Sequence, residues 1–290
     1  MGRLALAAVL LLLSMPSSLV PAQTQVDSPP GWKEGDRWEY RVIVQGPSET
    51  TFGNLSQEIA SVGPVRLDGR ALDAYSVTSR LSRSANNVNS STVSTIYVSR
   101  SDICVIFANS SSVTRMGDLS TRANVELRYN TSDGRYHFPL ATGAGWEVDY
   151  NLTRTLSTGN SVSVEDRWVH VSCACEGPEK VIVPAGRFMA QKIVCAQDAV
   201  NRTSYWYSEA VRGEVKREEL DGSTGVITTY ELTRYHRAQE PAFLLGTDTG
   251  LAMVLAGISM VLLAAAAIIF WRGRKRDVLP PEKGGPGKSI

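Results

Sequence analysis

The sequence has few of the residues and motifs on which most enzyme active sites depend. Three histidines occur in 290 residues: His137, His170 and His236. There is no Gly-x-Ser-x-Gly nucleophile elbow, no His-Glu-x-x-His zinc motif, no phosphate-binding loop and no dinucleotide fingerprint. The run 248–250 reads Asp-Thr-Gly, as in aspartic proteases, but that chemistry needs two facing aspartates and the motif occurs once. We therefore expect no catalytic residue, no cofactor and no enzymatic activity.

The chain also lacks an excess of positive charge. Its formal net charge is +1, and the region 23–246, which excludes both ends, carries a net charge of −3. Proteins that bind duplex nucleic acid need a basic face. We therefore expect no nucleic acid partner.

Residues 1–22 follow the layout of a secretory signal peptide. Arg3 precedes an unbroken apolar run, and Val20-Pro21-Ala22 supplies the small residues of a cleavage site. The apolar run is too short to span a bilayer as a stable helix. We expect cleavage after Ala22 and export of the chain. The alternative is a retained N-terminal anchor.

Residues 250–271 contain no charged side chain and have about the length of a membrane-spanning helix. Four basic residues follow within 272–276, and basic residues beside a span stay on the cytoplasmic side. We expect a single-pass protein of the cell membrane, with an extracellular N-terminal region and a basic cytoplasmic tail over 272–290. The alternative for 250–271 is a buried core helix. We interpret the basic residues of the tail as fixing this orientation. Their alternative role is contact with anionic lipid headgroups.

Apolar and polar residues alternate through most of the region 23–246. Between Asp36 and Gln45, for example, Trp38, Tyr40 and Val42 fall on one face and the charged residues between them on the other. A period of two is typical of half-buried β-strands. We find no long amphipathic helix outside 250–271, so we expect a mainly β fold.

One stretch of this region predicts a sharp reversal of the chain. Lys180–Val183 and Phe188–Ala196 are strand-like, and Pro184-Ala185-Gly186 separates them. Proline presets φ for a turn, and glycine accepts a positive φ. We expect a β-hairpin.

Three landmarks occur twice in the same order, about 110 residues apart. They are Gly35–Glu39 with Gly143–Glu147, Leu67–Arg70 with Pro184–Arg187, and Ile96–Ser99 with Tyr205–Ser208. Such an offset indicates an internal repeat. We predict two tandem curved antiparallel sheets, each resembling a half-barrel, followed by one C-terminal transmembrane helix. The first β domain would cover 23–130 and the second 131–246.

Four cysteines, an even number in an exported chain, indicate disulfides. In the hairpin described above, Cys175 falls opposite Cys195, so we predict that these two are bonded. Cys173 would then pair with Cys104 and join the two domains. A bulge near Gly177 would shift the register and pair Cys173 with Cys195 instead.

A metal site is a further interpretation of the same region, because His170 precedes Cys173 and Cys175. This spacing lacks the second pair of ligands that zinc sites usually have. We therefore expect no bound metal.

Six Asn-x-Ser/Thr sequons lie in the region 23–246, none with proline in the middle. Each is an acceptor for an N-linked glycan once the chain is exported. The asparagines are Asn54, Asn89, Asn109, Asn130, Asn151 and Asn201.

The second half of the region resembles a family of exported archaeal and bacterial domains of unknown function. The resemblance rests on the G-x-x-W motif at 143–146, V-P-A-G-x-F at 183–188, Y-W-Y-S at 205–208 and the Val-Lys pair at 215–216. Family members often have proline after Y-W-Y-S, whereas this chain has Glu209. Such domains are similar to the curved half-barrels of bacterial lipoprotein carriers. The resemblance therefore implies a concave apolar sheet and no catalytic residue.

Aromatic residues cluster at landmarks of the second half. Trp146, Tyr205, Trp206 and Tyr207 could line a pocket for an apolar ligand. The other interpretation is that they are ordinary core residues. An immunoglobulin fold is excluded, because Val171 stands where its tyrosine should precede the second cysteine, Cys173.

These observations leave three hypotheses. The first is a non-catalytic, glycosylated, single-pass surface protein that serves binding or envelope structure, with another surface protein as a partner. The second is a carrier-like receptor that holds a lipid or another apolar ligand in the concave sheet. The third is an extracellular hydrolase.

Overall fold

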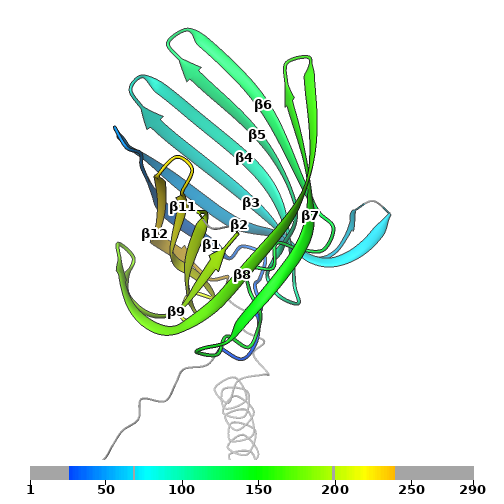
Figure 1. Ribbon diagram of the computed structural model, residues 1–290, viewed down its shortest axis with the longest axis vertical. Helices are drawn as coiled ribbons and strands as arrows, with labels where there is room; N and C mark the ends of the chain where they lie inside the picture. The colour runs from blue at the N-terminus through cyan, green and yellow to red at the C-terminus, as the bar shows by residue number, and fades with distance from the viewer. Residues whose placement is uncertain (1–25, 68, 198–199, 239–290) are drawn as a thin grey trace, which may run out of the picture. The chain divides into compact units, whose positions relative to one another are not determined.

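Twelve antiparallel strands form a closed barrel in a computed structural model, which describes residues 26–67, 69–197 and 200–238 (Figure 1). Consecutive strands are neighbours throughout, and β1 pairs with both β2 and β12. The strands are β1 (Arg37–Gln45), β2 (Thr50–Leu67), β3 (Arg70–Ala85), β4 (Val88–Ser99), β5 (Val105–Met116), β6 (Leu119–Tyr129), β7 (Gly145–Thr158), β8 (Ser161–Val183), β9 (Gly186–Ala196), β10 (Arg202–Ser208), β11 (Gly213–Asp221) and β12 (Val226–His236).

The described part of the chain is mainly β, as predicted, but two separate half-barrels were the wrong arrangement. The two predicted sheets are joined at both edges, because β6 pairs with β7 and β12 pairs with β1. An open sheet leaves a row of unpaired backbone groups at each edge, and closure into one barrel removes those edges. Each half of the sequence supplies six of the twelve strands.

The repeated landmarks occupy equivalent places six strands apart. Trp38 and Trp146 are the second residues of β1 and β7, and the two Gly-Arg pairs end the turns β2–β3 and β8–β9. The third pair of landmarks ends β4 and β10.

The backbone after the third landmark is also similar in the two halves. The register shifts between Tyr97 and Val98 in one half and between Trp206 and Tyr207 in the other. Ile103 and Arg212 then take φ angles of 52° and 53°, which are rare for residues other than glycine. The two halves therefore build the same turn at the same point.

Alternation places the core inside the barrel. On β1, Trp38, Tyr40 and Val42 are buried and face the interior, whereas Arg37 and Arg41 are exposed. This is the pattern that the sequence predicts for 36–45. The interior positions of the remaining strands are mostly apolar, aromatic or hydroxyl-bearing, so the main hydrophobic cluster lies within the barrel.

The predicted hairpin is present as β8 and β9, with Pro184 and Ala185 in the turn and Gly186 at a φ of 136°. Figure 1 shows this hairpin and that of β2 and β3 extending on different sides of the barrel. The turn of the β8–β9 hairpin is fixed to β12, because the backbone amide of Ala185 donates to the carbonyl of Leu232 at 2.9 Å.

The disulfide joins Cys173 to Cys195, so the preferred pairing of Cys175 with Cys195 was wrong. The hairpin pairs Val183 with Gly186, and one extra residue then forms a bulge between Cys175 and Gly177. The bulge places Cys173 opposite Cys195 and Cys175 opposite Ile193. This is the alternative that the sequence left open.

The predicted bridge between Cys104 and Cys173 is also absent, and Cys104 and Cys175 are buried free thiols. A site made by His170 with Cys173 and Cys175 is excluded by the same geometry. The His170 ring bonds Asp149 at 2.8 Å and is exposed, whereas Cys173 is buried in its disulfide.

The predicted signal peptide, transmembrane helix and basic tail lie outside the described residues. Within residues 26–238 as described, the structure has no helix of the length and apolar character that a membrane crossing requires.

Candidate functional site

The connection between β6 and β7, residues 130–144, enters the barrel; we name it the crossing segment. Its Tyr136 and Leu140 are buried, and Leu140 forms an isolated bridge with Val26. The backbone amide of Tyr136 lies 3.5 Å from Sγ of Cys104, which directly precedes β5. The ring nitrogen of Trp146 donates to the carbonyl of Gly134 at 2.9 Å. The crossing segment is therefore held by the residue that precedes β5 and by β7.

A cavity of about 270 Å³ lies beside the crossing segment. Its apolar wall comes from the interior faces of β2 to β5 and the turn after β4. The aliphatic side chains of that wall are Leu55, Ile59, Val77, Leu81, Ile96, Val98, Ile103 and Val105, and the polar side chains Gln57, Ser79, Thr92 and Ser94 of the same strands also line it. Six aromatic side chains also line it: Trp32, Trp38, Tyr40, Tyr136, Tyr207 and Tyr230.

The opposite wall of the cavity is charged. Arg135 of the crossing segment lies 3.8 Å from Oε1 of Glu214, and Arg217 lies 3.5 Å from Oε2 of the same carboxylate. Arg135 also bonds Asp133 at 2.6 Å, and Arg217 lies 3.1 Å from Glu219. Charges removed from water are tolerated when they are paired. These five side chains, the ion cluster, form a continuous network.

The electrostatics keep both arginines of the ion cluster cationic. Burial alone would lower the pKa of Arg217, but the carboxylates of Glu219 and Glu214 raise it above its usual range. Burial acts on Arg135 in the same way, and Asp133 is the main group that raises its pKa.

Tyrosines join the ion cluster to the rest of the cavity. The hydroxyl of Tyr136 donates to Oε1 of Glu214 at 2.8 Å, and that of Tyr40 donates to the Glu214 carbonyl at 3.1 Å. Burial raises the pKa of both tyrosines, so both remain protonated donors at neutral pH. The guanidinium of Arg217 stacks on the Tyr230 ring, 3.9 Å from its centroid.

A smaller cavity of about 150 Å³ also reaches the ion cluster. Tyr129, Tyr150 and Tyr205 are among its lining residues, together with Asp133 and Arg135. The Arg135 guanidinium lies 5.6 Å from the centroid of the Tyr205 ring. Arg135 therefore borders both cavities.

The four aromatic residues singled out in the sequence do not share one pocket. Residues two apart on a strand face the same side, so Tyr205 and Tyr207 of β10 both face the barrel interior. Tyr207 lines the larger cavity and Tyr205 lines the smaller one. Trp206 faces the other side, where Lys192 and Lys216 pack on its ring and Glu179 accepts its N–H at 3.0 Å. Trp146 packs beside His137 and holds the crossing segment.

Sequence reasoning missed the ion cluster. Arg217 and Glu219 occupy interior positions of β11, where an apolar residue is expected. That departure from the pattern was the available signal. Arg135, which reaches Arg217 only through Glu214, and its partner Asp133 belong to a connection that the sequence identified as a domain boundary, so the cluster could be found only from the fold.

Comparisons with known proteins identify no family. No protein-family model matches the chain, and no curated protein matches it. Among solved structures, a crystal structure described as a "putative lipoprotein" from Parabacteroides distasonis ATCC 8503 aligns with a TM-score of 0.30 and 11% identity, covering 72% of this chain and 97% of that one. A similarity of this strength supports no conclusion about function.

Proposed function

We propose that this chain is a non-catalytic binding protein whose barrel holds a small amphipathic ligand. The observation that carries the proposal is the two-sided cavity: one wall is mostly aliphatic and the other includes Arg135, Glu214 and Arg217 of the ion cluster. Ligand pockets are mostly apolar with a few placed polar groups, which fix the orientation of the ligand. A volume of about 270 Å³ is just below the usual range of roughly 300–1,000 Å³, so the ligand is small.

The charges of the ion cluster indicate the polar end of the ligand. Glu214 already faces both Arg135 and Arg217, so a bound group meets cations and anions side by side. A single net charge would be attracted by one sign and repelled by the other. A head group that both donates and accepts hydrogen bonds, such as an amide, a hydroxyl or a zwitterion, fits this wall best.

Display at the cell surface completes the proposed function. The signal peptide over 1–22 and the span over 250–271 would export the barrel and keep it attached to the cell membrane. The sequons support the same compartment, and the disulfide between Cys173 and Cys195 fits it as well. Another surface protein remains the partner expected if the barrel serves envelope structure alone.

The test is native mass spectrometry of the full chain after extraction in a gentle detergent. We expect one small molecule, distinct from the detergent, bound per chain. Replacing Val77 with phenylalanine places a larger side chain in the cavity. This variant should no longer carry the bound small molecule. Thr78→Phe places the same ring on the outer face of β3 and should keep it. A wild-type chain that carries no such molecule would favour a purely structural surface role.

A further inference from the structure

The sequons on strands all point outward. Asn54, Asn89, Asn109 and Asn151 lie on β2, β4, β5 and β7, each at a position whose strand neighbours face the barrel interior. Asn54, for example, is exposed between the buried residues Gly53 and Leu55. A glycan is bulky and needs an accessible acceptor. The fold therefore leaves all four side chains on the accessible face.

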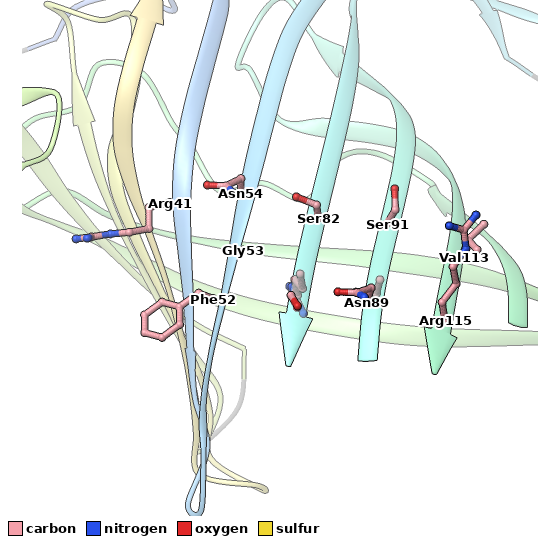
Figure 2. Close-up of a pocket in the computed structure, with 12 residues that line it drawn as sticks. Arg41, Phe52, Gly53, Asn54, Ser82, Asn89, Ser91, Val113 and Arg115 are labelled. Atoms are coloured by element: carbon pink, nitrogen blue, oxygen red, sulfur yellow. The ribbon is translucent and has the colours of Figure 1, made fainter. Parts of the chain in front are cut away.

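Asn54 has an aromatic neighbour on the same face. Phe52 precedes it by two residues, and the period of two along a strand places both side chains outside the barrel. Figure 2 shows Arg41, Phe52 and Asn54 projecting on the same side of their strands. The Phe52 side chain is 59% exposed. A phenylalanine outside the core adds little to the stability of the fold through burial, so its exposure here needs another explanation.

Asn109 provides a comparison within the same chain. It too has a phenylalanine two residues before it, Phe107. Tyr97 stacks on the Phe107 ring at 5.7 Å between centroids, and the Arg128 guanidinium lies over that ring at 5.7 Å. No such ring or cation contact involves Phe52 among the residues that the structure describes. Phe107 is covered by protein, whereas Phe52 is open.

A shallow groove runs across the outer face of β1 to β5 beside Phe52 (Figure 2). Its volume is about 670 Å³, and its other lining side chains are polar or basic except for Val113. Serine, asparagine and arginine side chains offer hydrogen bonds to hydroxyl groups. The groove therefore combines one apolar ring with many hydrogen-bonding groups, which is the chemistry that fits a sugar.

We propose that Asn54 carries an N-linked glycan whose first sugar stacks on Phe52 and whose next sugars lie in this groove. The apolar C–H face of a pyranose ring covers the open phenyl ring, and its hydroxyls meet the polar lining. The glycan covers the Phe52 ring in the same way that Tyr97 and Arg128 cover the Phe107 ring. This inference is independent of the interior cavity and depends on export of the chain.

The test uses the full chain exported by a host that makes N-linked glycans. Site-resolved glycopeptide mass spectrometry should find a glycan on Asn54. Enzymatic removal of the glycans should lower the midpoint of thermal unfolding by about 2–4 °C. In a Phe52→Thr variant, which removes the ring but places a residue that favours strands at the position, removal should cause a much smaller shift. An Asn54→Gln chain should likewise lose the part of the shift that depends on Phe52.

Asn109→Gln is the matched control, because the ring beside Asn109 is already covered. When the glycans are removed from this variant, the midpoint of thermal unfolding should fall by as much as it does in the wild-type chain. An exported chain with an unmodified Asn54 would overturn the proposal. So would equal shifts in the wild-type and Phe52→Thr chains. If Asn54 is unmodified and a free oligosaccharide binds in a Phe52-dependent way, the groove is a site for saccharides from another source and the proposal is wrong.

Discussion

Among single residues, the tyrosines of the interior combine burial with a polar end that stays protonated. Burial is the main cause that raises the pKa of Tyr40, Tyr136 and Tyr205. The Tyr136 hydroxyl donates to the Glu214 carboxylate, so loss of its proton would place two negative charges side by side, and the Tyr40 hydroxyl donates to the backbone carbonyl of Glu214. The ion cluster therefore depends on neutral tyrosines.

The stability of the barrel should decrease at alkaline pH. Burial raises the pKa of Tyr205 from 10.0 to about 12. A raised pKa means that the folded state holds the Tyr205 proton more tightly than the unfolded state does. The resulting contribution to the free energy of unfolding is complete below pH 10 and is lost between pH 10 and 12. At pH 11 this effect lowers the free energy of unfolding by about 1.4 kcal/mol. Urea unfolding at pH 8 and 11 should show a smaller decrease for Tyr205→Phe than for the wild type, and equal decreases would contradict this role.

The two neighbouring cysteines on β8 should differ in their effect on stability. Cys173→Ser removes a disulfide with a sequence separation of 22, which the chain-entropy model values at about 3 kcal/mol. Cys175→Ser changes only a buried thiol and should cost less. Thermal unfolding compares the two variants, and peptide mapping without reduction identifies the bond. A mapped bond between Cys175 and Cys195 would show that the bulge at Glu176 is misplaced.

Among the strands and turns, the sequence predicted the elements that depend on neighbours in the chain. The strand pattern of 36–45 and the turn at 184–186 follow from a period of two and from the properties of proline and glycine. The register of β8 did not follow, because one extra residue at Glu176 decides which cysteine meets Cys195. A bulge of one residue leaves no clear pattern in the sequence.

Gly186 should be required for the β8–β9 turn. Its φ of 136° lies where side chains cause strain, although a Cβ would meet nothing closer than 3.8 Å. Gly186→Ala should therefore destabilise the fold by about 1–2 kcal/mol through the backbone alone. Gly145→Ala is the control, since a Cβ there makes an ordinary contact of 3.5 Å with no positive φ. Equal unfolding free energies for the two variants would argue against this conformation.

For the barrel as a whole, closure depends on contacts between distant parts of the sequence. β1 pairs with β12, so Arg37 lies opposite His236. Local pattern cannot reveal such a pairing, and a repeat of six strands is compatible with two half-barrels or with one barrel. The ion cluster is hidden for the same reason, because Arg135 and Glu214 meet only when the barrel closes.

A closed barrel should unfold as one unit. Separate half-barrels would melt independently, whereas shared pairing along β6–β7 and β12–β1 couples the halves. We expect one calorimetric transition for the barrel, with equal calorimetric and van't Hoff enthalpies. Two transitions, one of which is retained when 131–246 is expressed without 23–130, would contradict a single barrel.

The central claim is that the interior cavity binds a small amphipathic molecule, and a binding titration tests it most directly. The full chain in lipid nanodiscs would be titrated with a fluorescent uncharged amphiphile, such as a dansyl amide with a short alkyl chain, against empty nanodiscs. We predict one saturable site per chain, with Kd unchanged in Thr78→Phe and weakened at least about tenfold, or about 1.4 kcal/mol, in Val77→Phe. The same Kd in all three folded chains, or no saturable binding above the nanodisc background, would contradict the account.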